Sequence, residues 1–358
     1  MYKYHLTDVD WGNFFVKDIF EIEKCKCSKV ATLSEGNIPY VGATNRNNGV
    51  LGFVHGDAKL ITKGKCIAFI CDGEGSIGYS IYKEEDFIGS TTIKVGRNSN
   101  LNKYNAKFIT TIADTVRSKY NFGFKRNEEH LKKEILQLPI DENGKLNWHF
   151  MEEYIKERVQ KQYTDMKIYY KQRLLALKNC QQLEESIEWG EFSLKDLFIF
   201  ERGNQNNMAL CKSGDIPLIS AKKVDNGVKT FISDNGKKLF DGHILTLNND
   251  GDGGVGIAYY QANKIALDTH VTALIPKVKI DRSSLLFISR SITIQRAKFS
   301  HGYSLNNNRM KAQKIILPLD EEKRPNWSYM KYFMINIERQ KIERILKYLD
   351  RYIISLLK

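Results

Sequence analysis

The sequence is poor in proline, cysteine and histidine, and these scarcities exclude several kinds of site. None of its 6 prolines is adjacent to another, so the Asn/Asp-Pro-Pro-aromatic strand end of base methyltransferases is absent. Of its 6 cysteines only Cys25 and Cys27 lie close together, and its 7 histidines form no tight cluster that would complete a zinc site. A phosphate-cradling Gly-Lys-Ser/Thr loop is also missing. We therefore expect free cysteine thiols, and no catalytic residue, metal or cofactor.

Long apolar runs are equally absent. No stretch approaches the roughly 20 residues that a membrane-spanning helix needs. The first residues, MYKYHLTDVDWGNFF, lack the basic segment and apolar core of a secretory signal. The sequence therefore predicts a cytoplasmic protein.

Positive charge, by contrast, is in surplus. The 358 residues include 55 Lys and Arg against 42 Asp and Glu, which gives a formal net charge of +13. Such a surplus favours a polyanionic partner, either nucleic acid or an anionic membrane surface. Solubility alone is an alternative explanation at this point.

The most informative feature is an internal repeat. Trp11-Gly12-Asn13-Phe14 returns 178 residues later as Trp189-Gly190-Glu191-Phe192. The same offset relates Ile38-Pro39 to Ile216-Pro217, Asn48-Gly49-Val50 to Asn226-Gly227-Val228, Asp72-Gly73 to Asp250-Gly251, and Gly78 to Gly256. After one inserted residue the offset is 179, and it relates Leu138-Pro139 to Leu317-Pro318 and Asn147-Trp148 to Asn326-Trp327. So many Trp, Gly and Pro matches in one register indicate a duplication into two similar domains.

Each repeat alternates short β-rich runs with glycine-rich turns, a pattern typical of a curled antiparallel sheet or a small barrel. The runs include 66–70, 78–82 and 91–95 in the first repeat and 244–247, 256–260 and 271–275 in the second. We expect hairpin turns, not metal or phosphate sites, at Asp72-Gly73 and Asp250-Gly251. Helical stretches near Ala106–Arg117 and Leu285–Ala297 give each domain an α+β character.

The segments after Trp148 and Trp327 predict two long helices, because apolar residues recur there at three- and four-residue steps without Gly or Pro. The apolar stripes comprise Met151, Ile155, Val159, Met166, Tyr170, Leu174 and Leu177, and then Met330, Met334, Ile337, Ile345, Leu349, Ile353 and Leu356. A helix of roughly 30–40 residues with one apolar stripe needs a packing partner. We expect the two helices to pack as an antiparallel coiled coil, and the alternative is that each folds back on its own domain.

The expected organisation therefore has four parts. A β-rich domain spans residues 1–147, a spacer helix 148–187, a second β-rich domain 188–325 and a second spacer helix 326–358. The fold class is α+β, with two tandem β-rich domains that are each followed by a long helix.

The order of domain, long helix, domain and long helix, with the motifs of each unit present twice, resembles the specificity subunit of type I restriction–modification systems. It also resembles the closely related subunit of type IIB systems. The resemblance covers essentially the whole chain. Its motifs are Trp11-Gly12 with Phe20, Trp189-Gly190 with Phe198, the Ile-Pro pairs 38–39 and 216–217, and the Leu-Pro ends 138–139 and 317–318. The endings at 147–151 and 326–330 look more like type IIB. The Pro-Leu-Pro-x-x-Glu-Gln helix start of many type I subunits is replaced by Ile-Asp-Glu and Leu-Asp-Glu, so the subtype stays open.

The resemblance implies that each domain is a target recognition domain that reads one half of a split site in double-stranded DNA. It also implies that the helices set the gap between the halves and dock two methyltransferase subunits. A restriction subunit is a further candidate partner, and no membrane is involved. The chain itself is then a non-catalytic subunit.

Loops rich in basic and amide side chains occur at matching places in the two repeats. They are the candidate DNA contacts, because Arg and Lys suit guanine and Asn and Gln suit adenine. The first repeat provides Thr44, Asn45, Arg46, Asn47, Lys119, Tyr120, Lys125 and Arg126. The second provides Asn204, Gln205, Asn206, Lys222, Lys223, Lys298, His301, Tyr303, Asn306 and Asn307. The loops differ in side chain while their flanks agree, as expected of one scaffold that reads two half-sites; for any single residue, a solvated turn is the alternative.

Two rival functions remain open from the sequence alone. One is a coiled-coil adaptor whose basic domains bind DNA without sequence preference. The other is a hydrolase with duplicated β domains, which would need a cleft with matched acid and base groups.

Overall fold

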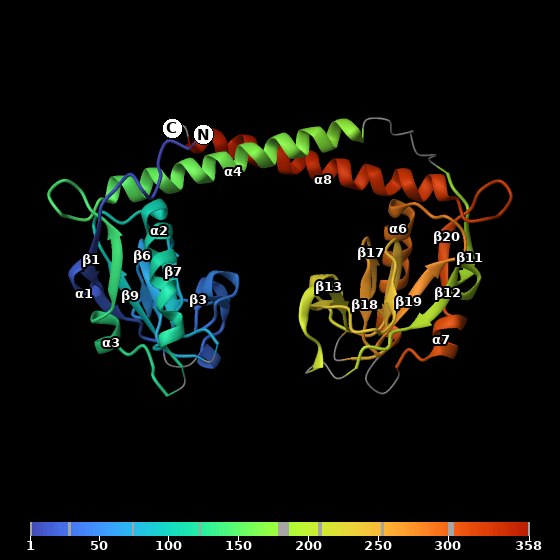
Figure 1. The fold of residues 1–358 in the computed structure, drawn as a ribbon, viewed down its shortest axis with the longest axis horizontal. Coiled ribbons are helices and arrows are strands. Elements are labelled where there is room, and N and C mark those ends of the chain that lie inside the picture. The colour runs from blue at the N-terminus through green and yellow to red at the C-terminus, as the bar shows by residue number, and fades with distance from the viewer. Residues whose placement is uncertain are drawn as a thin grey trace. The chain divides into compact units, whose positions relative to one another are not determined.

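The computed structural model describes residues 2–27, 30–73, 75–121, 123–177, 186–206, 210–251, 254–299 and 304–356, with side chains as far as residue 352. The chain divides into two compact units. Unit 1 comprises Met1–Ile168 with Leu349–Lys358, and unit 2 comprises Tyr169–Tyr348. Each unit therefore contains one β-rich domain and the end of the long helix that follows the other domain (Figure 1).

The described part of unit 1 contains ten strands, three short or medium helices and most of one long helix. Its strands are β1 (Trp11–Phe15), β2 (Glu21–Lys24), β3 (Glu35–Val41), β4 (Val50–Val54), β5 (Ile61–Thr62), β6 (Cys66–Ile70), β7 (Ser80–Lys83), β8 (Phe87–Gly89), β9 (Ile93–Arg97) and β10 (Ile135–Pro139). Its helices are α1 (Val16–Ile19), α2 (Lys103–Ala113), α3 (Glu128–Lys132) and α4 (Trp148–Ala176).

Unit 2 repeats this order element by element. Its strands are β11 (Trp189–Ser193), β12 (Phe198–Arg202), β13 (Ser213–Ile219), β14 (Val228–Ile232), β15 (Leu239–Phe240), β16 (Ile244–Asn248), β17 (Ala258–Gln261), β18 (Ile265–Leu267), β19 (Val271–Pro276) and β20 (Lys314–Pro318). Its helices are α5 (Leu194–Leu197), α6 (Arg282–Thr293), α7 (Asn307–Ala312) and α8 (Trp327–Leu356).

The strands of each unit form three small sheets with the same topology in both repeats. In unit 1 the strand orders are β2-β9-β6-β7, β4-β3-β8-β5 and β1-β10. Unit 2 has β12-β19-β16-β17, β14-β13-β18-β15 and β11-β20. Among the named strands of the described residues, the pairings are antiparallel except β3 with β8 and β13 with β18, which are parallel. The expected duplication and α+β class are confirmed, but separate sheets with one parallel pair replace the curled antiparallel sheet or barrel.

A central strand buried on both faces organises each core. Every residue of β6 is buried, and alternate side chains enter two different apolar clusters. Ile67 and Phe69 join the cluster under α2, whereas Cys66, Ala68 and Ile70 join the cluster toward β8 and β9. In unit 2, β16 divides its side chains in the same way. This explains why β6 is continuously apolar, since both faces of the strand exclude water.

Cysteines belong to this core. Among the described residues Cys25, Cys27, Cys66, Cys71 and Cys211 are free thiols, as expected. Burial raises the pKa of Cys66 to about 12 and that of Cys71 to about 11, so both remain protonated and unreactive at neutral pH.

One repeated glycine is explained by a close backbone approach. A Cβ atom on Gly64 would lie 2.1 Å from the carbonyl oxygen of Glu84, and a Cβ on Gly242 would lie 2.1 Å from that of Ala262. No side chain fits between these segments, so glycine recurs at the equivalent position of both repeats.

The two long helices start in the same way. Asn147 accepts a hydrogen bond from the backbone N–H of Phe150 at 2.9 Å, and Asn326 does so from Tyr329 at 2.9 Å. These caps explain the repeated Asn-Trp pair. Helix α4 begins at Trp148 and its described part ends at Ala176, while residues 178–185 of the expected 148–187 helix lie outside the described residues. No helix in the described part of the chain is long and apolar enough to cross a membrane.

Each unit contains contacts between α4 and α8. In unit 1 the rings of Tyr163 and Tyr352 stack with centroids 4.2 Å apart, and Lys167 forms an ion pair with Asp350. In unit 2 the guanidinium of Arg173 donates to both carboxylate oxygens of Glu338, at 2.6 and 3.0 Å. Leu349 of α8 is buried in unit 1. Each long helix therefore contributes its end to the packing of the opposite unit.

Replacing Phe69 by alanine is expected to lower the free energy of unfolding of unit 1 by about 3–5 kcal/mol, because its ring is fully buried and packs against Phe20. The measurement is urea denaturation of the full chain, with hydrogen exchange to identify the unit that opens. Leu51→Ala is the control, since Leu51 is 60% exposed and its removal should change stability by less than about 0.5 kcal/mol. Equal losses for the two variants would contradict the assigned core.

Candidate nucleic-acid interface

The first candidate loop has the same backbone in both units. The N–H of Gly42 donates to the carbonyl of Gly49 at 3.0 Å, and the equivalent bond from Ser220 to Gly227 measures 2.9 Å. The two residues that precede Gly49 have positive φ angles, 48° at residue 47 and 52° at residue 48. The two that precede Gly227 do too, with 55° at residue 225 and 52° at residue 226. Asn, Asp and Gly tolerate this left-handed region, so their recurrence follows from the turn.

The side chains on this shared backbone differ between the units. In unit 1, Asn45, Arg46 and Asn47 are exposed, while Thr44 is half-buried and its hydroxyl accepts a hydrogen bond from the N–H of Arg46. In unit 2, Lys223 is exposed. The ammonium of Lys222 donates to Asp225 at 2.9 Å and to the carbonyl of Val228 at 2.8 Å, so it is partly occupied within its own loop.

A buried side chain supports this loop from below in each unit, and its chemistry differs. Lys83, which is only 4% exposed, donates from its ammonium to the carbonyl of Asn48 at 3.1 Å, and burial lowers the pKa of this lysine. Its counterpart Gln261 donates to the carbonyl of Asn226 at 3.1 Å and accepts from the side-chain amide of Asn226 at 3.2 Å. The donor to the loop carbonyl is therefore the charged ammonium of Lys83 in unit 1 and the neutral side-chain amide of Gln261 in unit 2.

Only part of the second candidate loop of unit 1 is accessible. Lys119 is exposed, and Lys125 is about half-exposed and forms an ion pair of 2.7 Å with Asp72. This hydrogen bond from Lys125 lowers the pKa of the Asp72 carboxyl, so the aspartate is ionised at neutral pH.

Tyr120 and Arg126, also predicted as DNA contacts, lie inside unit 1. Tyr120 is 9% exposed and donates from its hydroxyl to Glu134, and Arg126 has no exposed surface. Both guanidinium edges are occupied: Nε and Nη2 donate to Glu134 at 2.6 Å each, and Nη1 donates to the carbonyl of Gly78 at 3.0 Å. Their burial removes both residues from the predicted DNA contacts, because charged and polar groups with complete internal partners have no donor left for a base.

The equivalent loop of unit 2 is richer in amides. Asn306 and Asn307 are exposed at the start of α7, where the side chain of Asn306 accepts from the N–H of Arg309. Lys298 is exposed and donates to the side chain of Gln295 at 3.0 Å. The predicted contacts His301 and Tyr303 lie outside the described residues.

The third candidate loop, at Asn204–Asn206, contributes two exposed residues. Asn204 and Asn206 are exposed, and the side-chain oxygen of Asn206 accepts a hydrogen bond from Lys237. Gln205 is 1% exposed, and its amide exchanges two hydrogen bonds with that of Asn235, at 2.9 and 3.1 Å. Its burial and this amide pair remove Gln205 from the predicted contacts.

The glycine-rich turns bring these loops together. Gly73, Gly75 and Gly78 have the Gly-x-Gly-x-x-Gly spacing of phosphate-binding turns, as do Gly251, Gly253 and Gly256. Each turn joins two antiparallel strands and opens no helix, so the expected hairpin turns are confirmed. A Cβ on Gly73 would lie 2.5 Å from that of Ala43, which places the turn directly against the first loop.

Two arginines outside the predicted contacts are further candidates: Arg117 begins the second candidate loop, and Arg202 was missed by the analysis of the sequence. The guanidinium of Arg117 stacks on the ring of Tyr79, 3.7 Å from its centroid, beside a pocket of about 640 Å³ that Asp72 and Asn121 also line. In unit 2, Arg202 lines a polar pocket of about 410 Å³ with Asn249 and with residues 306–308. The repeat offset aligns Arg202 with Lys24, and this pair of basic residues at equivalent positions could have identified Arg202 as a candidate from the sequence.

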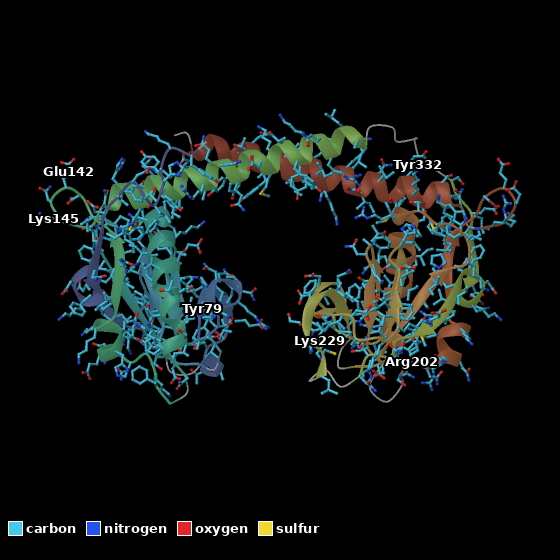
Figure 2. All side chains as sticks on the ribbon, in the orientation of Figure 1. Tyr79, Glu142, Lys145, Arg202, Lys229 and Tyr332 are labelled. Atoms are coloured by element: carbon cyan, nitrogen blue, oxygen red, sulfur yellow. The ribbon has the colours of Figure 1, made fainter. Side chains whose placement is uncertain are left out.

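Within each unit these loops lie at the end remote from the long helix. The side chain of Asn102, at the start of α2, donates to Glu152 of α4 at 2.9 Å, so the far end of α2 and the loop after it point away from α4. In unit 2, Ser284 at the start of α6 donates to the carbonyl of Trp327 at 3.1 Å. Figure 2 shows Arg202 at the end of unit 2 opposite Tyr332 of α8. No cluster of potential metal ligands occurs among the described residues.

Comparisons with known proteins identify the family of the chain. The family model of the type I restriction modification DNA specificity domain matches residues 8–164 and again 186–347. A curated relative, the type II restriction enzyme BgcI specificity subunit S.BcgI of Heyndrickxia coagulans, is 24% identical over 340 residues, which cover 94% of this chain and 97% of the relative.

Two solved structures complete the comparison. The type I restriction-modification S subunit from M. genitalium matches with a TM-score of 0.53 and 14% identity, covering 98% of this chain and 96% of that one. The HsdS subunit from Thermoanaerobacter tengcongensis matches with a TM-score of 0.33 and 13% identity over 99% and 97% of the two chains. With the family model matched in both repeats, the chain belongs to the type I restriction modification DNA specificity domain family, the non-catalytic specificity subunits of restriction–modification systems.

Proposed function

We propose that this specificity subunit reads a bipartite site in double-stranded DNA, with one unit for each half-site. The observation that carries the proposal is the pair of loops at residues 42–49 and 220–227, which have one backbone geometry and different exposed side chains. Because the two units share this backbone geometry, they present side chains at equivalent positions of their loops. A different side chain at such a position then reads a different base.

The exposed side chains suit direct reading of bases and binding of phosphates. In unit 1 the contacts are Asn45, Arg46, Asn47 and Lys119, with Thr44 and Lys125 beside them. Unit 2 contributes Asn204, Asn206, Lys222, Lys223, Lys298, Asn306 and Asn307, and we add Arg117 in unit 1 and Arg202 in unit 2. Arg and Lys bind guanine acceptors in the major groove and phosphates, whereas Asn forms paired hydrogen bonds with adenine. The His301 and Tyr303 contacts remain predictions.

We further propose that α4 and α8 pack as an antiparallel coiled coil that sets the unread gap between the half-sites. The supporting contacts advance along α4 as they retreat along α8: Tyr163 with Tyr352, Lys167 with Asp350, and Arg173 with Glu338. A helix of this kind has a rise of about 1.5 Å per residue, so its length converts directly into a number of base pairs.

Methyl transfer and cleavage then come from partners, and we propose that two methyltransferase subunits dock on the helical region. Equivalent turns precede the two long helices. Asp141 accepts hydrogen bonds from the N–H groups of Asn143 and Lys145, and Asp320 accepts them from Glu322 and Arg324. Figure 2 shows Glu142 and Lys145 on the turn beside α4. Two equivalent turns give two equivalent docking places, and a restriction subunit is a further candidate partner.

Selection from a pool of random duplex DNA by the full chain is expected to enrich two separated half-sites. Arg46→Ala should flatten the base preference in one half, and Lys223→Ala should flatten it in the other, because each loop belongs to a different unit. The loss should be about 1–3 kcal/mol of discrimination at the affected position. Lys17→Ala, a basic residue outside the candidate loops, is the control. Binding without any enriched sequence would favour the adaptor alternative.

Shortening the helices is expected to change the gap and not the half-sites. A matched deletion of seven residues from each of α4 and α8 preserves the apolar stripe and removes about 10 Å, or about three base pairs. The same selection measures the spacing. An unchanged gap with unchanged half-sites would refute the coiled coil as the spacer.

Asp72→Asn is expected to strengthen DNA binding by about 1 kcal/mol, because it removes a negative charge beside the candidate loop residue Lys125. A plot of the logarithm of affinity against the logarithm of salt concentration should have a steeper negative slope, by about 1, which corresponds to one more neutralised phosphate. Asp86→Asn, which removes an ion pair with Lys63 elsewhere on unit 1, is the matched control and should change neither quantity. An unchanged affinity and salt dependence of the Asp72 variant would place the turn outside the interface.

A further inference from the structure

Arg126 occupies a position in unit 1 where the two repeats have diverged. At the offset of 179 residues, Tyr120, Arg126 and Glu134 correspond to Phe299, Leu305 and Gln313. The backbones around them agree: the carbonyl of Glu134 accepts from the N–H of Val16 at 2.9 Å, and that of Gln313 accepts from Leu194 at 2.9 Å. A buried ionic network in unit 1 thus occupies the place of a neutral set in unit 2.

We propose that Arg126 is a positioning residue for reading the first half-site: it fixes the Gly73–Gly78 turn of unit 1 against the loop that carries Lys119. This inference rests on the proposed function and goes beyond it, because Arg126 cannot touch DNA from its buried place. Its effect reaches the bases through the two loops that it joins.

The contacts of Arg126 join segments that are far apart in the chain. Nη1 donates to the carbonyls of Gly78 and Tyr79, at 3.0 and 3.3 Å, and to the hydroxyl of Ser80 at 3.2 Å. These acceptors end the glycine-rich turn, 46 to 48 residues before Arg126. Because Gly73 at the other end of that turn packs on Ala43, one guanidinium connects the first loop, the turn and the second loop.

Glu134 completes the network from the opposite side. Its two carboxylate oxygens accept from Nε and Nη2 of Arg126, and one of them also accepts from the hydroxyl of Tyr120 at 2.5 Å. The fork of the guanidinium therefore has a fixed orientation, since a planar bidentate pair allows no rotation. Lysine could supply the charge but not this set of directed hydrogen bonds.

Stability alone does not explain the network. A buried ion pair is often replaced by apolar residues without loss of stability, whereas removal of one partner leaves an uncompensated charge. This chain contains the neutral version in unit 2, where Leu305 and Gln313 are buried and no described residue bonds to the amide of Gln313. The network of unit 1 thus has a role that the fold itself does not require.

Unit 2 anchors its equivalent turn by a different residue. The side-chain amide of Asn248 donates to the carbonyl of Gly254 at 3.0 Å and to that of Lys222 at 3.1 Å. Its counterpart in unit 1 is Ile70, which has no polar group. Each unit therefore has its own anchor, Arg126 or Asn248, and each anchor can be removed separately.

The test uses the full chain and a pool of random duplex DNA. The double variant R126L/E134Q introduces the leucine and glutamine of unit 2 and removes both charges together, so no buried charge is left uncompensated and unit 1 should fold. We expect the base preference of the first half-site to fall about tenfold, while the second half-site stays as in the wild type and unit 1 still unfolds cooperatively. The variant E129Q/K133L, which removes an exposed ion pair from neighbouring α3, is the matched control and should leave both halves unchanged.

The reciprocal variant N248L should flatten the second half-site and spare the first, and it keeps the proposal testable if the double variant fails to fold. Unchanged reading of the first half-site by folded R126L/E134Q would overturn the positioning role of Arg126, and unchanged reading of the second half-site by N248L would overturn the idea that a buried donor to the turn positions the reading loops. Failure of the wild-type chain to enrich any half-site would instead refute the proposed function. R126L alone should destabilise unit 1, because it leaves Glu134 buried without its partner.

Discussion

Buried carbonyl groups of the surface loops each need a hydrogen-bond donor, and this requirement determines how both units are built. A loop that is packed against its neighbours loses water from its backbone, and an unsatisfied carbonyl in such a place is costly. Unit 1 satisfies the requirement with cations, since Lys83 donates to Asn48 and Arg126 donates to Gly78. Unit 2 uses the amides of Gln261 and Asn248 for the same purpose. The loops of the two units have the same backbone hydrogen bond and φ angles because their carbonyl groups need a donor in both, although the donor side chains differ.

This arrangement separates the scaffold from the residues that it presents. The donors are buried and the loop tips are exposed, so a change at the tip, such as Arg46 against Val224, leaves the supporting hydrogen bonds intact. The scaffold rests in turn on the doubly buried strands β6 and β16, whose continuous burial leaves little freedom to move. A duplicated domain of this construction can diverge in its exposed side chains while it keeps its fold.

Much of this organisation could be predicted from the residues. The repeat is visible because Trp, Gly and Pro recur where the two domains share a geometric requirement: Gly64 and Gly242 have no space for a side chain, and the asparagines at 147 and 326 cap helices. The long helices were predicted from the spacing of apolar residues, and the turns at Asp72-Gly73 and Asp250-Gly251 from their position between strands. The prediction of individual DNA contacts was less successful. Tyr120, Arg126 and Gln205 are residue types that bind DNA, and yet all three are buried.

The sequence by itself determined the duplication, the α+β class, the two long helices and the positions of the loops rich in basic and amide side chains, because these follow from local geometry and from the period of apolar residues. Only the tertiary structure decided which polar side chains face solvent. Glu134 lies eight residues after Arg126 and Gly78 lies 48 residues before it, so the burial of that arginine depends on contacts between segments that no local pattern relates. A charged side chain is exposed or buried according to whether the fold supplies its partners, and the fold is a property of the whole chain.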